Sequence, residues 1–255
     1  MNIGDRLDFT IDAGVATVSL NRPPVNAIDD ALLAALDQVF DQIEADESLK
    51  LLRIRSARKI FCAGADLCMI SARVGTAEGA AEMDKTVRLL HRVYDRLADL
   101  PVVTLAEIEG HALGGGLELA LACDLRIVME TAKLGLPEAR VGLLPGAGGT
   151  QRLTALCGPG VAARVILSGE TLEGREAERL GLAQWVATKE DFAAAAQGIA
   201  ERVRGLSAPA LRAAKTCLRA AAPLQKSGIA AEIDGICRLM QEPDTRERVL
   251  GFVKR

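Results

Sequence analysis

Apolar and polar residues alternate over the first two segments of the chain. The runs Leu7–Asp12 and Val15–Leu20 both show this alternation, and Ala13-Gly14 lies between them. A side-chain period of two is typical of half-buried strands, so the pattern predicts a β-hairpin. The segment Asn21-Arg22-Pro23-Pro24 ends the second predicted strand, because it concentrates residues that favour turns.

Helical spacing replaces this alternation in the next long segment. Apolar residues recur three or four positions apart and predict a helix from near Asp29 to near Asp46: Leu32, Leu33, Leu36, Val39, Phe40 and Ile43. The short run Leu51–Arg55 then predicts a strand. The segment Ser56–Asp66 is rich in small residues and predicts a loop.

A second long helix and two further strands follow. The helix is predicted from apolar residues at helical spacing: Met83, Val87, Leu90, Tyr94 and Leu97. Pro101 ends this helix, and Val102–Ile108 predicts a strand. The segment His111–Gly116 precedes a short helix that runs through Ala122, and Leu125–Met129 predicts another strand. This alternation of strands and helices indicates an α/β fold.

The last quarter of the chain predicts helices only. Ser207 is expected to cap a helix in which Pro209 lies early. One apolar stripe near the C-terminus consists of Ile229, Ile233, Ile236, Leu239 and Met240. Because such a stripe must be buried, we take it as an indication of assembly between chains. The pattern therefore divides the chain into two regions. We predict a core α/β domain over residues 1–190 and a helical region for oligomerisation over residues 191–255.

Composition narrows the functional classes. The 255 residues carry a formal net charge of −3, which argues against a nucleic-acid-binding surface. No apolar run reaches the ~18 residues of a membrane span. The six cysteines include no CxxC pair and only two histidines occur, so we expect neither a metal site nor disulfides. Residues 1–12 predict a strand rather than a secretory signal, and we expect reduced, small, buried cysteines in a cytoplasmic protein.

Two segments of small residues could approach a ligand through their backbone. The first, Phe61–Leu67, lies between a predicted strand and helix, where a tight turn is the alternative interpretation. The second contains Gly114-Gly115-Gly116 at the start of a predicted helix, a place that favours an anion or a developing negative charge. A dinucleotide-binding G-x-G-x-x-G motif is absent because the third position is Leu119, and no Gly-Lys-Ser/Thr sequence occurs.

Two glutamates are candidates for acid/base chemistry. Glu118 lies in the otherwise apolar run Leu117–Ala122, where a carboxylate is costly unless it is used or paired. Glu138 follows Pro137 in a glycine-rich segment, twenty positions further along. The two carboxylates can converge only through the fold, and such pairs divide acid and base roles when their environments differ. An ordinary partnered glutamate on a helix face is the alternative for Glu118.

Taken together, these segments resemble the enoyl-CoA hydratase/isomerase (crotonase) superfamily. The order and spacing of the motifs extend the resemblance over essentially the whole chain. The motifs are Asn21-Arg22-Pro23, Ala63-Gly64-Ala65-Asp66, Gly114-Gly115-Gly116-Leu117-Glu118-Leu119, Cys123-Asp124, Pro137-Glu138 and Pro145–Leu153.

The resemblance implies a fold, an assembly and a reaction. The expected fold is a crotonase-like superhelix of repeated ββα units with a C-terminal helical trimerisation region, in a homotrimer or a dimer of trimers. The expected reaction is reversible addition of water across the 2,3 double bond of an enoyl-CoA, with no cofactor because coenzyme A belongs to the substrate. The amides of Ala65 and Gly115 would form the oxyanion hole. Glu118 would activate water, and Glu138 would handle the α-carbon proton.

The resemblance also implies which residues contact the substrate, and it leaves alternatives open. The expected contacts are Val25, Ala27, Ala63, Asp66, Leu67, Leu113, Gly114, Pro137 and Gly142, with acyl preference set by loops such as Met69–Ala81. Arg58 and Lys59 either bind the phosphates of coenzyme A or are solvated surface charges, and His111 is interpreted as structural. The alternatives to a hydratase are double-bond isomerisation and a non-catalytic acyl-CoA-binding protein.

Overall fold

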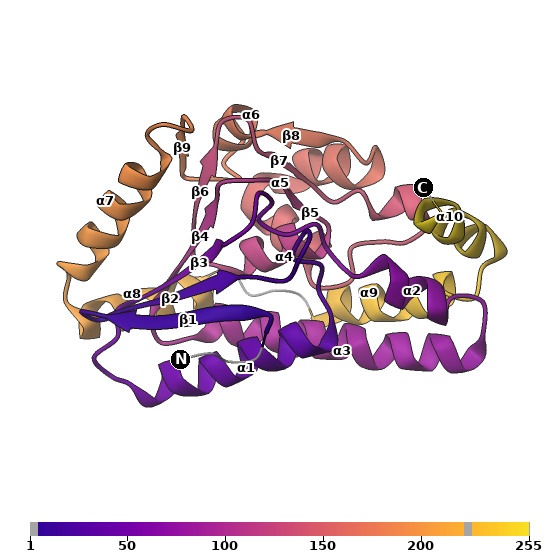
Figure 1. Cartoon of the computed structure of the whole chain (residues 1–255), viewed down its shortest axis with the longest axis horizontal. Helices are drawn as coiled ribbons and strands as arrows, with labels where there is room; N and C mark the ends of the chain where they lie inside the picture. Colours follow the sequence, from indigo (N-terminus) through magenta and orange to yellow (C-terminus); the bar gives the residue numbers. More distant parts are fainter. Residues whose placement is uncertain (1–4, 222–225, 255) are drawn as a thin grey trace.

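The predicted hairpin forms the edge of a six-stranded sheet in the computed structural model, which describes residues 5–221 and 226–254 (Figure 1). The first two strands are antiparallel, whereas the remaining strands join in parallel, in the order β1-β2-β3-β4-β6-β9. These strands are β1 (Leu7–Asp12), β2 (Val15–Leu20), β3 (Leu51–Ser56), β4 (Val103–Ile108), β6 (Leu125–Met129) and β9 (Trp185–Ala187).

A second, smaller sheet lies beside the first, and its strand β5 leads directly into Gly114-Gly115-Gly116. It has the order β5-β7-β8 and consists of β5 (Ala112–Leu113), β7 (Lys133–Gly135) and β8 (Thr171–Glu173). The helices of the core are α1 (Asp30–Ala45), α2 (Leu67–Arg73), α3 (Ala77–Asp99), α4 (Gly115–Ala122), α5 (Gly149–Leu167) and α6 (Gly174–Arg179), with a short 3-10 helix, η1 (Glu138–Val141). The α/β prediction is confirmed.

The helix predicted between Asp29 and Asp46 is confirmed with those two residues as its caps. The side chain of Asp29 accepts a hydrogen bond from the Leu32 amide at 2.8 Å, which satisfies one of the unpaired amides at the helix start. The apolar positions of α1 are buried, as their spacing predicts. The strand predicted at Leu51–Arg55 extends one residue further, to Ser56.

The segment Met69–Ala81 was expected to be a loop, and this prediction is wrong. Most of it belongs to α2 and to the first turn of α3. Each helix has an N-cap from its own sequence: Asp66 accepts from two amides of α2, and Thr76 accepts from the Gly79 amide. These local capping bonds account for the helical structure.

The C-terminal region is helical within the described residues, as predicted. Its helices are α7 (Phe192–Arg204), α8 (Ala208–Ala221), α9 (Lys226–Leu239) and α10 (Pro243–Val253). They pack on two parts of the core: α7 covers Leu51, Leu105 and Ile127 of the large sheet, whereas α9 and α10 pack against α3 and α2 (Figure 1). None of the helices in the described ranges is long and apolar enough to cross a membrane.

Two expectations about side chains need correction. The apolar stripe of α9, which includes Ile233 and Ile236, is buried within the same chain against residues such as Met83 and Val87 of α3. The stripe therefore does not require a partner chain. The prediction of buried cysteines is right for Cys62 and Cys123 and wrong for the exposed pair, Cys68 and Cys217.

Candidate functional site

Glycines bring the two predicted backbone segments into direct contact. Gly64 has φ +97°, and a Cβ atom at this position would lie 2.9 Å from the Leu113 carbonyl oxygen and 3.3 Å from the Gly115 nitrogen. Conversely, a Cβ atom at Gly115 would lie 3.6 Å from the Ala65 nitrogen. Only residues without side chains allow this approach. The Tyr94 hydroxyl donates to the Gly115 carbonyl at 3.0 Å and anchors the start of α4.

The amides of Ala65 and Gly115 remain available at this contact. Neither donates a hydrogen bond to another residue in the described ranges, whereas one neighbouring amide of each is engaged. The Asp66 amide donates to Ile28 at 3.0 Å, and the Gly114 amide donates to Gly135 at 2.9 Å. Gly115 is the first residue of α4, where the helix dipole adds positive potential. Two adjacent free donors of this kind can stabilise one oxygen that gains negative charge.

Glu118 is buried on the next turn of α4, with 3% of its surface exposed. Its Oε1 atom accepts hydrogen bonds from the amides of Ala147 and Gly149, both at 2.8 Å. Burial, reinforced by the nearby Glu232 carboxylate, raises the pKa of Glu118 to about 7, although the two amide donors oppose this shift. A carboxylate with that pKa can accept a proton near neutral pH.

Glu138 has a different environment at the start of η1. A Cβ atom at Gly114 would lie 2.8 Å from its Oε1 atom, so the carboxyl group faces the glycine run. Its Oε2 atom is buried and has no hydrogen-bond partner among the residues described. Burial raises the pKa of Glu138 well above the ordinary value, and the negative charges of Glu118 and Glu232 act in the same direction. The protonated acid is therefore the favoured form of Glu138.

Several predicted substrate contacts lie in or next to the segments that carry Ala65 and Glu138. The Ala63 amide donates to the Val25 carbonyl at 3.1 Å, and Leu67 begins α2. Pro137 and Gly142 flank η1, and Gly142 has φ +75°. A Cβ atom there would lie 2.8 Å from Thr245 Oγ1 of α10, so glycine allows the C-terminal helix to pack closely.

Asp66 already has a structural role. Its carboxylate pairs with Arg22 at 2.5 Å and also caps α2. Arg22 in turn donates to the Ala27 carbonyl at 2.9 Å, so these three residues brace the loop that carries Ala65. The hydrogen bonds from Arg22 and from the amides of α2 lower the pKa of Asp66 against the opposing effect of burial.

Three other candidates lie outside the carboxylate pair. Arg58 and Lys59 are exposed in the bend after β3, which leaves both interpretations of their charges open. His111 accepts a hydrogen bond from the Lys133 amide through Nδ1 at 3.0 Å. This bond ties β7 to the segment before β5 and agrees with a structural role for His111.

Glu232 of α9 is a further buried carboxylate that was not among the residues predicted from the sequence. This glutamate is 3% exposed and accepts hydrogen bonds from the Gly148 amide, at 2.7 Å, and from the Thr150 hydroxyl. A signal existed, because Glu232 stands among Ile229, Ile233 and Ile236 at helical spacing in the apolar stripe.

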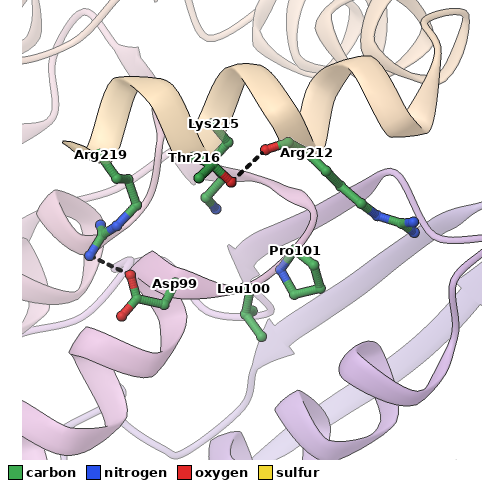
Figure 2. A pocket seen from close by; sticks show the side chains of 7 residues that line it. All are labelled: Asp99, Leu100, Pro101, Arg212, Lys215, Thr216 and Arg219. Carbon is green, nitrogen blue, oxygen red and sulfur yellow. Dashed lines mark hydrogen bonds and ion pairs between the residues drawn. The ribbon is translucent and has the colours of Figure 1, made fainter. Parts of the chain in front are cut away.

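A separate hollow of about 250 Å³ lies between α8 and the end of α3 (Figure 2). Its three cationic side chains have partners: Lys215 bonds Asp124 at 2.7 Å, Arg219 bonds Asp99 at 2.6 Å, and Arg212 donates to the Glu47 carbonyl at 2.5 Å. The buried Nε atom of Arg212 has no hydrogen-bond partner among the described residues. The hollow shares no residue with the carboxylate pair. Its contacts indicate that α8 is attached to the core here.

Comparison with known proteins identifies related chains. A family model described as Enoyl-CoA hydratase/isomerase matches residues 10–255. Enoyl-CoA hydratase domain-containing protein 2, mitochondrial, of Bos taurus is 39% identical over 246 residues, which cover 94% of this chain and 80% of that protein. The structure of Pseudomonas aeruginosa DspI has a TM-score of 0.81 at 36% identity, covering 100% of this chain and 96% of that one. An enoyl-CoA hydratase from Mycobacterium avium subsp. paratuberculosis K-10 has a TM-score of 0.87 at 27% identity, covering 96% and 98%.

Proposed function

Because this chain belongs to the enoyl-CoA hydratase/isomerase family and has its crotonase-like α/β fold, we propose that it is an enoyl-CoA hydratase. The reaction is the reversible addition of water across the 2,3 double bond of an enoyl-CoA thioester. One observation carries the proposal: two carboxylates in unlike environments lie beside two adjacent backbone amides that have no partner among the described residues. Glu118 is buried, whereas Glu138 is half-buried with its Oε2 atom out of contact with solvent.

The two amides serve the thioester carbonyl. Attack of water at the β-carbon moves negative charge onto the carbonyl oxygen and produces an enolate-like species. The amides of Ala65 and Gly115 are positioned to donate to that oxygen, and the start of α4 adds its dipole. Since backbone donors need no reorganisation during the reaction, they stabilise the charged species more than the neutral substrate.

The two carboxylates divide the proton transfers. Glu118 is held by two amide donors that favour its ionised form, and it removes a proton from the attacking water. Glu138 lacks such donors at Oε2 and carries the proton that is delivered to the α-carbon. The hydroxide equivalent bonds to the β-carbon, the proton bonds to the α-carbon, and the carbonyl is restored. No cofactor is required, because coenzyme A is part of the substrate.

The acyl chain and the assembly are part of the same proposal. Partly buried apolar side chains from α2 and the segment after η1, including Leu67, Met69 and Leu144, pack on the same apolar cluster as Ala65 and are available to contact an acyl chain. The cationic Arg58 and Lys59 are candidates for the coenzyme A phosphates. We further propose a homotrimer or a dimer of trimers on the family resemblance. A concentration-independent monomer mass in light scattering contradicts that assembly.

The function is tested with short-, medium- and long-chain 2-enoyl-CoA thioesters in ¹⁸O-labelled water. We expect the absorbance of the conjugated thioester to fall and a 3-hydroxyacyl-CoA that carries the label to appear. Formation of a positional enoyl isomer without label indicates the isomerase instead. Binding of the thioesters without any turnover indicates a non-catalytic acyl-CoA-binding protein.

A further inference from the structure

Hydrogen bonds from residues 147–150 alternate between two buried glutamates. The amides of Ala147 and Gly149 donate to Glu118 Oε1, both at 2.8 Å. The intervening Gly148 amide donates to Glu232 Oε2 at 2.7 Å, and the Thr150 hydroxyl donates to Glu232 Oε1. One short backbone segment at the start of α5 is therefore held from α4 by Glu118 and from α9 by Glu232.

We propose that Glu232 is a positioning residue of the acid/base site, which holds residues 147–150 in the conformation that presents two amides to Glu118. This inference rests on the proposed function, since it assigns a role beside the base that activates water. Glu232 would act through the backbone and through its charge, without touching the substrate.

The conformation of the segment explains why it needs a second anchor. Gly148 has φ +89°, a left-handed conformation that glycine alone adopts without strain. The Arg152 side chain provides further support by donating to the Ala147 carbonyl at 2.8 Å and by pairing with Asp95. Without Glu232, the Gly148 amide loses its carboxylate partner, and the amides on either side of it lose their fixed direction toward Glu118.

Glu232 also places a further carboxylate close enough to the acid/base pair to raise the pKa of both members. Burial raises the pKa of Glu232 itself, and the hydrogen bonds from Thr150 and Gly148 oppose that shift. His91 Nε2 lies 3.4 Å from Glu232 Oε2, but burial lowers the pKa of His91 and favours its neutral form. The charge of Glu232 thus favours the protonated forms of both catalytic glutamates. The titratable and charged groups that interact with Glu232 are Glu118 of α4, Glu138 of η1, Arg152 of α5 and His91 of α3. Arg88 and Asp95 of α3 act on His91 in turn.

Two substitutions separate the hydrogen bonds from the charge. Glu232→Ala removes both bonds, and we expect kcat for hydration to fall roughly tenfold to a hundredfold with a smaller change in KM, because misplacement of a base acts on the chemical step. Glu232→Gln can accept from the Gly148 amide and donate to the Thr150 hydroxyl. We therefore expect it to keep most of kcat while the acidic limb of the kcat/KM profile moves to lower pH.

A matched control lies on the same helix. Asp234 lies two positions after Glu232 in α9 and is exposed. Asp234→Asn therefore removes one negative charge from the same helix without removing a buried carboxylate. This variant should leave both kcat and the pH profile unchanged. If Glu232→Ala and Glu232→Gln only lower the unfolding temperature, and the folded enzyme keeps the kcat and pH profile of the wild type, Glu232 is structural and the proposal is wrong.

A second readout does not require activity. The free energy of unfolding is measured as a function of pH for four proteins: the wild type, Glu118→Gln, Glu232→Gln and the variant with both substitutions. In each background, the effect of Glu118→Gln on stability is the difference between the proteins with and without it. This difference rises with pH until the pH exceeds the pKa of Glu118 in the folded protein. Because Glu232→Gln removes a negative charge that raises this pKa, we expect the difference to level off at lower pH in the Glu232→Gln background. Coincident curves overturn the electrostatic link. A shifted curve in a protein that hydrates no enoyl-CoA contradicts the proposed function alone.

Discussion

The Gly149 amide donates to Glu118 Oε1 at 2.8 Å, and a Cβ atom at position 149 would lie 2.7 Å from the same oxygen. The backbone of α5 can therefore reach the carboxylate only because residue 149 has no side chain. The added carbon would also lie 2.9 Å from Glu118 Cγ and 3.1 Å from Leu136 Cδ1. The packing leaves little room for Glu118 to yield.

We predict that Gly149→Ala lowers kcat for hydration about 100-fold by displacing Glu118 from its water-activating position. Gly160→Ala is the control, because it lies in α5 beyond the kink at the non-helical Gly158, with nothing within 4 Å of an added Cβ atom. Steady-state kinetics with an enoyl-CoA measures both variants. Equal loss in both would show that α5, rather than Glu118, is disturbed.

Gly115 gives a prediction about substrate binding. A Cβ atom there would lie 3.0 Å from Ile28 Cδ1 and 3.6 Å from the Ala65 nitrogen, between the two proposed donors. We expect Gly115→Val to fold and to lose affinity for a non-hydrolysable acyl-CoA analogue in calorimetry. Gly115→Pro, which deletes the amide donor, should abolish activity. If Gly115→Val bound the analogue as tightly as the wild type, the thioester would not lie against this segment and the proposed site would be wrong.

The raised pKa of Glu118 predicts a pH-dependent stability difference. Between the ordinary pKa of 4.5 and about 7, the folded protein keeps a proton that the unfolded chain releases. The free energy of unfolding therefore falls as the pH rises through this window. Glu118→Gln cannot undergo this loss, so its stability relative to the wild type should increase from pH 5 to pH 8, by on the order of a few kcal/mol. Denaturant unfolding at both pH values measures the difference, and a constant offset contradicts it.

Activity should depend on pH with two limbs. Glu118 must be ionised, so kcat/KM should rise with pH through about 7, where the pKa of this base lies. Glu138 must be protonated, so kcat/KM should fall at higher pH, above the raised pKa of the acid. Rate measurements across this range test the assignment. A profile that is flat from weakly acidic to neutral pH argues against Glu118 as the base.

Apart from β9, whose three residues show no period, the strands of the large sheet could be predicted, as could the first helix, because their apolar positions repeat with a clear period. The strands of the small sheet could not, since β7 and β8 have three residues each and β5 has two. Helix α2 was hidden for a related reason: it has seven residues, one of them buried, and its start depends on the Asp66 cap. Short elements are determined by tertiary contacts and caps rather than by periodicity.

The residue types of the candidate site could likewise be predicted from the sequence, whereas contacts between residues far apart in the chain could not. The glycine runs and both glutamates stand out in the sequence by residue type, and the fold brings their segments together. Glu232 lies 114 positions beyond Glu118, and nothing local relates the two. The double role of Asp66 was equally hidden, because its partner Arg22 precedes it by 44 positions. Such relationships require the three-dimensional structure.

The division of labour between the two glutamates is tested most directly by measuring two reactions of Glu118→Gln and Glu138→Gln. The first is hydration of an enoyl-CoA, and the second is exchange of the α-carbon protons of a saturated acyl-CoA in D₂O, which needs no attacking water. Both substitutions are nearly isosteric and should preserve the fold.

We predict that each variant loses hydration activity by at least ~100-fold, the usual scale for a positioned acid or base. Glu118→Gln should retain α-proton exchange, whereas Glu138→Gln should lose it. Near-wild-type hydration by either variant would contradict the two-carboxylate mechanism, and tolerance of Glu118→Gln alone would favour isomerisation.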